Sequence, residues 1–340
     1  MRTRPVQHAP AHRPYGRIAF PLALLGCTGL LAAGPATPAT AHPTAHAAAV
    51  IPVSTAQQLK DALATAGPGD TITLADGTYR GNFKTTRAGS PAAPITLTGS
   101  AKAVLTAGGG YGLHLNGADD WRLRGFTVTG GQKGIVMDAA NGVHIDGVTV
   151  RGLTMEGVHW RKSSANGSIK NSTIRDTGTD GRGMGEGIYV GSAGGTSDKS
   201  DHILIEKNTL GPGIGGENID VKEGTTGTRI IGNTFDGSGL TGAHYDDSWV
   251  DIKGNDVLVE NNVGRRTTND GYQTHEVQPG WGCRTTFRGN KSDLSGSTGP
   301  DRYAIHVTHY DAQRCPTTVT SSNTVTGGRG LTNPGIPVRN

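Results

Sequence analysis

Residues 112–131 read GLHLNGADDWRLRGFTVTGG, and residues 134–153 read GIVMDAANGVHIDGVTVRGL. Each stretch holds a short strand of alternating apolar and polar residues, a turn, a second alternating strand and a further turn. The same order returns several times along the chain. The first apolar residues of these copies are Leu113, Ile135, Val158, Ile188, Ile219, Val250 and Ile305, with one more turn, at Tyr272, between the last two. A period near 22 residues, lengthened in places by loops, is typical of a solenoid.

The repeat predicts an all-β fold, a single-stranded right-handed parallel β-helix. Leucine-rich repeats have a similar period, but their regular Leu and Asn signature is absent. The segment STAQQLKDALATA (residues 54–66) predicts an N-terminal capping helix, with Ser54 and Gln57 as a capping box and one apolar stripe. An open coil would leave an exposed sheet edge, which such a helix covers. We expect one domain over residues 48–340.

Asparagines and cysteines recur in the same register and support this stacking. Each of five asparagines follows the second strand of its repeat, so they should form a ladder along the coil. These residues are Asn208, Asn233, Asn262, Asn290 and Asn323. Cys283 and Cys315 precede the last two ladder positions by seven and eight residues, so neighbouring coils should bring them within disulfide distance.

The first 47 residues read as a secretory signal peptide. Arg2, Arg4, Arg13 and Arg17 form a basic start, an apolar run follows, and small residues mark a cleavage site. Without these four arginines, 28 of the 32 basic residues remain against 28 acidic ones. This balance gives no reason to expect a nucleic-acid partner. We therefore predict a secreted, extracellular protein, without a membrane span and monomeric.

Charged residues gather where the alternation turns side chains outward. In NIDVK (residues 218–222), Ile219 and Val221 point inward, so Asp220 and Lys222 point outward. The same parity in each repeat predicts one outward column on a single face. Its charged and polar members are His114, Asn116, Asp138, His159, Arg161, Tyr189, Asp220, Lys222, Asp251, Lys253 and His306. Glu156, Glu186 and Glu217 occupy equivalent places just before the strand.

Such a column predicts a bound cation and an acidic polysaccharide substrate. Stacked carboxylates repel unless something compensates, and Ca²⁺ prefers oxygen ligands. The expected ligands are Glu186, Glu217, Asp220 and Asp251. A neutral lysine can abstract the proton at C5 of a uronate, after which loss of the O4 substituent completes β-elimination. Lys222 is the first candidate for this base and Lys253 the second, while Arg161 would hold the carboxylate or assist the leaving oxygen.

The capping helix, the segment GDTITLADGTY (residues 69–79), the coils and ENIDVKEGTTGTRIIGN (residues 217–233) resemble secreted pectate-lyase-like β-helix proteins. Among these are the pectate, alginate and dermatan-cleaving (chondroitinase B-type) polysaccharide lyases. The resemblance implies that acidic residues upstream of a lysine bind Ca²⁺ and that this lysine is the base. Those enzymes carry an arginine one coil later. TGAHYDDSW (residues 241–249) lies there instead, and its His244 would take the arginine's place.

Two alternatives remain open. A glycoside hydrolase on the same coil would use paired carboxylates, for which Asp246 and Asp247 are the candidates. A carbohydrate-binding or surface protein without catalysis would depend on aromatic side chains, because fold alone does not fix function. Its candidates are Trp160, Tyr189, Trp249, Tyr272 and Trp281, although parity turns Trp160 inward.

Overall fold

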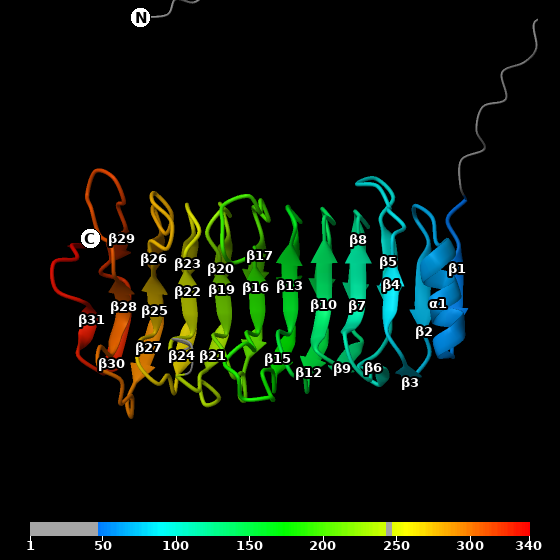
Figure 1. Cartoon of the computed structure of the whole chain (residues 1–340), viewed down its shortest axis with the longest axis horizontal. Helices are drawn as coiled ribbons and strands as arrows, with labels where there is room; N and C mark the ends of the chain where they lie inside the picture. Colours follow the sequence, from blue (N-terminus) through cyan, green and yellow to red (C-terminus); the bar gives the residue numbers. More distant parts are fainter. Residues whose placement is uncertain (1–46, 243–246) are drawn as a thin grey trace, which may run out of the picture. The chain divides into compact units, whose positions relative to one another are not determined.

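The structure is a computed structural model that describes residues 47–242 and 247–340. These residues lie within one compact unit, Ala45–Asn340. Three parallel sheets run along this unit, and each coil of the chain contributes one short strand to each sheet. Figure 1 shows the strands side by side in sequence order, with the only helix of the described residues at the N-terminal end. The predicted parallel β-helix is therefore confirmed.

Sheet C carries the outward column predicted from the sequence. It has ten strands, each paired in parallel with the strand of the next coil. In chain order they are β4 (Phe83–Thr85), β7 (Tyr111–Asn116), β10 (Lys133–Asp138), β13 (Val158–Arg161), β16 (Ile188–Val190), β19 (Ile219–Val221), β22 (Val250–Ile252), β25 (Tyr272–Thr274), β28 (Tyr303–Val307) and β31 (Gly330–Thr332).

Sheet A follows sheet C along each coil and has twelve strands. They are β1 (Val50–Val53), β2 (Thr71–Leu74), β5 (Ile95–Thr98), β8 (Trp121–Arg124), β11 (His144–Asp146), β14 (Ser168–Lys170), β17 (Leu204–Glu206), β20 (Arg229–Ile231), β23 (Leu258–Glu260), β26 (Thr286–Arg288), β29 (Thr318–Thr320) and β32 (Val338–Arg339).

Sheet B completes each coil and has ten strands. They are β3 (Gly77–Arg80), β6 (Ala103–Ala107), β9 (Thr127–Gly130), β12 (Thr149–Arg151), β15 (Thr173–Arg175), β18 (Thr209–Leu210), β21 (Thr234–Asp236), β24 (Val263–Arg265), β27 (Lys291–Leu294) and β30 (Thr324–Gly327).

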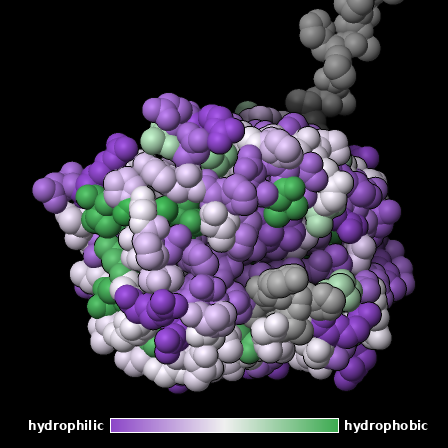
Figure 2. Space-filling view, turned by 60° about the vertical axis from the view of Figure 1, so that its left-hand side comes forward, coloured by the Kyte–Doolittle hydropathy of each residue, from purple (hydrophilic) through white to green (hydrophobic). Residues whose placement is uncertain are grey.

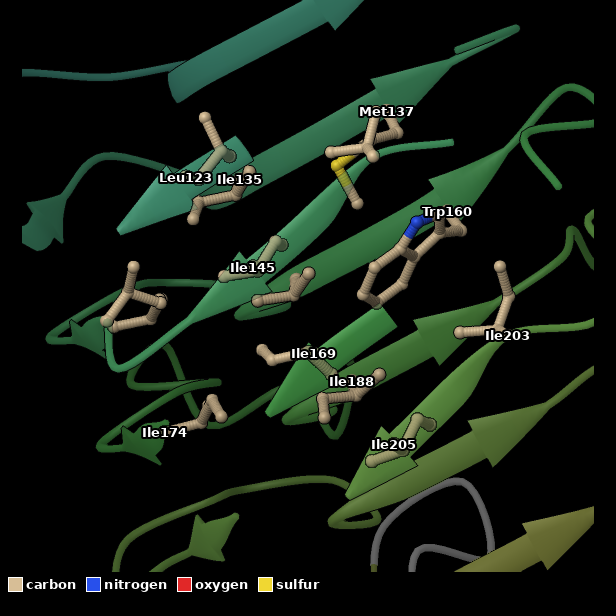
Figure 3. Packing of buried hydrophobic residues seen from close by; sticks show 14 of the residues in the cluster. Leu123, Ile135, Met137, Ile145, Trp160, Ile169, Ile174, Ile188, Ile203 and Ile205 are labelled. Atoms are coloured by element: carbon tan, nitrogen blue, oxygen red, sulfur yellow. The ribbon is translucent and has the colours of Figure 1, made fainter. Parts of the chain in front are cut away.

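The core is a thin stack of aliphatic side chains inside the coil. Ile135, Ile188 and Ile219 come from successive coils of sheet C and are fully buried. Figure 3 shows how such residues from different sheets meet in the interior. The alternation of short strands, with every second side chain inside, is what fills this narrow space. Trp160 lies in the same interior, as its parity predicted.

The asparagine ladder is present along one corner of the coil. The Oδ1 atom of Asn233 accepts bonds from the backbone and side-chain nitrogens of Asn208, at 2.9 and 3.0 Å. Asn262, Asn290 and Asn323 repeat this pattern toward the C-terminus. All five are buried, so each amide satisfies backbone groups that water does not reach.

The predicted disulfide and cap are also present. Cys283 and Cys315 are bonded across neighbouring coils. The capping helix α1 spans Ala56–Thr65 and buries Leu59, Ala62 and Leu63 against the coil. Its capping box is formed by Thr55 and Gln58, one residue later than expected, because the helix begins at Ala56. Among residues 47–242 and 247–340, no helix has the length and hydropathy to span a membrane.

Candidate active site

Sheet C aligns polar side chains from five successive coils. Tyr189 on β16 is in register with Asp220 on β19, which is in register with Asp251 on β22. Gln273 and His306 continue the column. A second, parallel column follows two residues later on the same face, as the strand period requires. Its members are Lys222, Lys253, His275 and Thr308.

A cavity of about 710 Å³ lies over these columns. Its walls include Gly183 and Met184 from the segment before β16, and Glu276 and Val277 from the segment after β25. Asp220 is 1% exposed and Asp251 is 4% exposed, although both point outward from the sheet. The outward residues are therefore buried at the bottom of a cavity. Figure 2 shows a mainly hydrophilic surface on the C-terminal side of this unit.

Two lysines and two aspartates form a buried ionic network in this cavity. Lys222 Nζ lies 2.5 Å from Asp220 Oδ2, and Lys253 Nζ lies 3.1 Å from Asp220 Oδ1. Lys253 also contacts Asp251, whose other oxygen is 2.7 Å from His275 Nδ1. Burial disfavours the charged lysine, but the carboxylates of Asp220 and Asp251 outweigh it and raise the pKa of Lys253 well above its usual value. Lys253 is therefore held as an ammonium.

Three carboxylates converge next to this network. One oxygen from each of Glu186, Glu217 and Asp220 lies within 4.8 Å of the others. Burial, together with the charge of Asp220, raises the pKa of Glu186 to about 8. The same two causes raise the pKa of Glu217 well above its usual value. Within the described chain neither glutamate has a Lys, Arg or His within ion-pair distance, so their charges lack a protein counter-ion.

This trio fits a divalent cation, while the fourth expected ligand lies elsewhere. Carboxylate oxygens are the ligands that Ca²⁺ and Mg²⁺ prefer, and three of them converge here, two from glutamates without a cationic partner in the described chain. Asp251 instead bonds Lys253 and His275. Burial alone would raise the pKa of Asp251, but these two partners hold it well below its usual value. The structure thus brings Glu186, Glu217 and Asp220 together and directs Asp251 to the lysine network.

Tyr189 lies at the edge of the ionic network. The Nζ atom of Lys222 is 5.0 Å from the centre of its ring. The ring of His159 packs edge-on against it at 4.5 Å. No hydrogen bond to its hydroxyl occurs among the residues that the structure describes, and burial raises the pKa of this hydroxyl. Sequence reasoning gave Tyr189 a role only as a sugar-binding aromatic. The outward column predicted from the sequence already placed Tyr189 next to Asp220, and that register pointed to the site without indicating a catalytic role.

Arg161 and His244 do not join this cluster in the structure. Arg161 lies two coils before Lys222 and bonds both oxygens of Asp138 and the hydroxyl of Tyr111. It is not among the residues that line the cavity. His244 falls in residues 243–246, which lie outside the described residues. Asp246, half of the carboxylate pair expected for a hydrolase, lies there as well.

The far end of the cavity carries amides and histidines. Asp247 accepts hydrogen bonds from Asn269 and Gln273, at 2.9 and 2.8 Å. His306 Nδ1 lies 2.7 Å from Asp270 Oδ2. This hydrogen bond is the main cause that raises the pKa of His306. Hydrogen-bond donors and acceptors of this kind suit the hydroxyl groups of a sugar.

Three of the five aromatic residues expected to form a sugar-binding platform, Trp160, Trp249 and Tyr272, are not at the surface, whereas Trp281 is partly exposed. Trp249 and Tyr272 are fully buried and pack against Phe235 inside the coil. Their large side chains fill this part of the interior together with Phe235. This placement corrects the expectation that they would be available to stack on sugar rings.

Comparison with solved structures relates the chain to known enzymes. The alginate lyase from Paenibacillus sp. str. FPU-7 is 36% identical, and the match covers 86% of this chain and 97% of that one with a TM-score of 0.73. The chain belongs to the family of this lyase. The two chains share the fold described above, since the alignment extends over nearly the whole of the Paenibacillus enzyme.

More distant matches agree on the fold of the family. Pectate lyase Pel9A is 13% identical, covers 78% of this chain and 72% of its own, and has a TM-score of 0.58. A mannuronic acid specific polysaccharide family 6 lyase from human gut microbiota is 14% identical and has a TM-score of 0.52. The match covers 85% of this chain and 78% of that one. Residues 111–210 match the family described as right handed beta helix region. A search of curated protein sequences gave no match.

Proposed function

We propose that this protein is a polysaccharide lyase that cleaves a uronate polymer by β-elimination in the cavity on sheet C. The observation that supports it most is the buried network of Lys222, Lys253 and Asp220 beside Glu186 and Glu217, two carboxyl groups without a cationic partner in the described chain. Membership of a lyase family makes the same chemistry the first to test. Alginate is the first substrate to try, because the Paenibacillus relative is an alginate lyase.

Lys222 is proposed as the base. Its Nζ atom takes the C5 proton of the uronate, the electron pair forms the C4–C5 double bond, and the C4–O4 bond breaks. Lys222 must be neutral when it takes that proton. Its Nζ atom contacts one carboxylate, that of Asp220, whereas Lys253 contacts the carboxylates of both Asp220 and Asp251. Lys253 itself is the weaker candidate, because two carboxylates hold its proton.

Tyr189 is proposed as the group that protonates the leaving O4 oxygen. Its hydroxyl carries a proton, since burial raises its pKa, and no described residue competes for that proton by hydrogen bonding. The ring lies against Lys222, so the two groups share one substrate position. Arg161 is assigned to a carboxylate of a sugar two coils away from the bond that is cleaved.

Glu186, Glu217 and Asp220 would hold a divalent cation, with Ca²⁺ as the expected ion. When bound, the cation withdraws charge from the uronate carboxylate and so makes the C5 proton more acidic. We also infer that the chain is exported as a single domain with one disulfide, because a polymer substrate of this kind lies outside the cell.

The test is a panel of alginate, pectate, glucuronan and glycosaminoglycans, each with and without a chelator. A lyase produces a double bond conjugated to the carboxylate, which is followed by its ultraviolet absorbance. Lys222→Ala should abolish this signal, and Lys291→Ala, at an exposed lysine on β27, should leave it intact. New reducing ends without absorbance would instead indicate a hydrolase. Binding without either product would indicate a non-catalytic protein.

A fluorinated substrate separates the base from the acid. Fluorine at C4 leaves as fluoride and needs no proton donor. Tyr189→Phe should therefore be slow on the polymer but close to the parent on the 4-fluoro uronoside. Lys222→Ala should be inactive on both. The reverse pattern, in which the fluorinated substrate rescues Lys222→Ala and not Tyr189→Phe, would exchange the two roles.

A further inference from the structure

A second cavity lies on sheet A, away from the proposed active site on sheet C. Its volume is about 320 Å³, at the lower end of ligand-binding cavities. Three neighbouring strands line it: β8 with Arg122 and Arg124, β11 with His144, and β14 with Lys170. Nothing in the proposed β-elimination uses these residues.

The lining is rich in cations with few carboxylates to neutralise them. In the part of the chain that the structure describes, neither Arg122 nor Arg124 has a carboxylate within 4.0 Å, whereas Lys170 contacts Glu206 at 3.0 Å. Asp146 is the acidic residue in the lining, and it accepts a hydrogen bond from Asn171. The guanidinium of Arg122 is held in place by two backbone hydrogen bonds, because its Nη1 donates to the carbonyl oxygens of Trp121 and Gly142.

The titration of two lining residues agrees with a positive local potential. Burial, followed by the charges of Arg122 and Lys170, lowers the pKa of His144 to about 4. Burial, and to a smaller degree Arg124, lowers the pKa of Arg122, although Asp120 acts in the opposite direction. His144 is thus neutral at physiological pH, and its Nδ1 lies 2.7 Å from the Oγ atom of Ser168.

The spacing of the cations suits an extended anion. Arg122 and Arg124 are two residues apart on one strand, which places their backbones roughly 7 Å apart. Lys170 is two strands away from Arg124 in register, at about 9.5 Å, and Asp146 of β11 occupies the register position between them. A polymer that repeats a carboxylate along its length reaches all three positions, while one small oxyanion is restricted to one or two.

We propose that the cavity formed by Arg122, Arg124, His144 and Lys170 binds a segment of anionic polysaccharide and anchors the protein to its polymer. The choice of a uronate polymer as ligand rests on the proposed function. A second anchoring point raises the local concentration of substrate at the active site without new contacts there.

The test is affinity electrophoresis of the full chain through native gels with and without alginate. All proteins carry Lys222→Ala, so that the polymer is not cleaved during the run. Arg124→Glu should weaken retention about three- to fivefold at low salt, the effect of one exposed charge pair. Arg124→Lys should stay within about twofold of the parent, because the charge is kept. Arg80→Glu, at an exposed arginine on sheet B, is the matched control and should retain normal binding.

Three results would overturn the proposal. One is an equal loss of retention in Arg124→Glu and Arg80→Glu, which would indicate total charge alone. Another is no loss in Arg124→Glu. The third is displacement by inorganic sulfate at matched ionic strength without displacement by alginate oligosaccharides, which would indicate a small-ion site. The assay requires no turnover. A protein that cleaves no polymer but depends on Arg124 for retention would therefore contradict the proposed function and leave this proposal standing.

Discussion

Lys253 Nζ lies 3.1 Å from Asp220 Oδ1, although 33 residues separate the two positions in the chain. The contact exists because β19 and β22 are neighbours in sheet C with Asp220 opposite Asp251. Lys253 thereby bridges two buried aspartates of adjacent coils. The same ammonium serves stability and the charge balance of the proposed active site.

Removing this ammonium should destabilise the fold. Lys253→Met leaves Asp220 and Asp251 buried with fewer partners and should cost about 3–5 kcal/mol, as for other broken buried ion pairs. Urea unfolding of the purified protein measures the loss. Lys253→Met combined with Asp251→Asn should recover part of it, because one of the stranded charges is removed. An unchanged unfolding midpoint for the single variant would show that the network contributes little.

Cation binding should stabilise the protein and release protons. Glu186 has a pKa of about 8 without a cation, so at about pH 7 it is largely protonated and must lose that proton on binding. Titration calorimetry with Ca²⁺ in two buffers of different ionisation enthalpy measures the release. A hundredfold excess over the dissociation constant should add about 2.7 kcal/mol to the unfolding free energy.

Glu186→Gln with Glu217→Gln is the variant that tests the same site. Ca²⁺ should no longer raise the unfolding free energy of this variant. With a chelator present, the variant should be at least as stable as the parent at about pH 8. The sign follows from the raised pKa of Glu186: the stability it contributes is present below its unfolded pKa and lost as pH rises through the folded value. Glu260→Gln, outside the cavity on sheet A, should respond to Ca²⁺ like the parent.

His306 should give a pH-dependent contribution to stability. Its hydrogen bond with Asp270 raises its pKa above the ordinary value of 6.5. This contribution is therefore full below that value and is lost as pH rises through the folded pKa. Urea unfolding of the parent and His306→Gln should differ more at about pH 5.5 than at about pH 8.5. A difference that grows with pH would contradict the assignment.

Interrupting the asparagine ladder should be costly. Asn262→Ala removes the acceptor of two Asn233 donors and the donor to Ile230, all of them buried. We expect a loss of about 3 kcal/mol or more, since each buried unsatisfied group costs about 1–3 kcal/mol. Thr234→Ala, exposed on the adjoining β21, should change the unfolding free energy by less than about 0.5 kcal/mol.

The sequence predicted the coil, the ladder, the disulfide and the alignment of charged residues, because all four depend on the repeat alone. Alternation fixes which side chains point outward, and the period fixes which of them are neighbours. These two rules are enough to place Asp220, Lys222 and Lys253 together. They also place Glu186 beside Glu217, and the structure agrees.

The repeat could not predict the path of the loops between strands. It also could not predict which of several nearby charged groups each side chain would contact. The segments that contain Met184 and Val277 contribute walls to the cavity over the outward face of sheet C. The sequence assigned Asp251 to the cation ligands. In the structure its carboxylate contacts Lys253 and His275 instead. Arg161 likewise pairs with Asp138 on the preceding strand. Such choices depend on side-chain geometry that parity does not specify.

Parallel stacking also limits how this architecture can change. The wall residues of the cavity come from several adjacent windings, so inserting one whole winding between β19 and β22 would move Lys253 about 4.8 Å farther from Asp220 while altering no amino acid at the site. Windings added beyond either end of that region would lengthen the protein and leave the wall intact. Gain or loss of whole windings is thus tolerated at the two ends of the β-helix and excluded between the strands that carry the cavity.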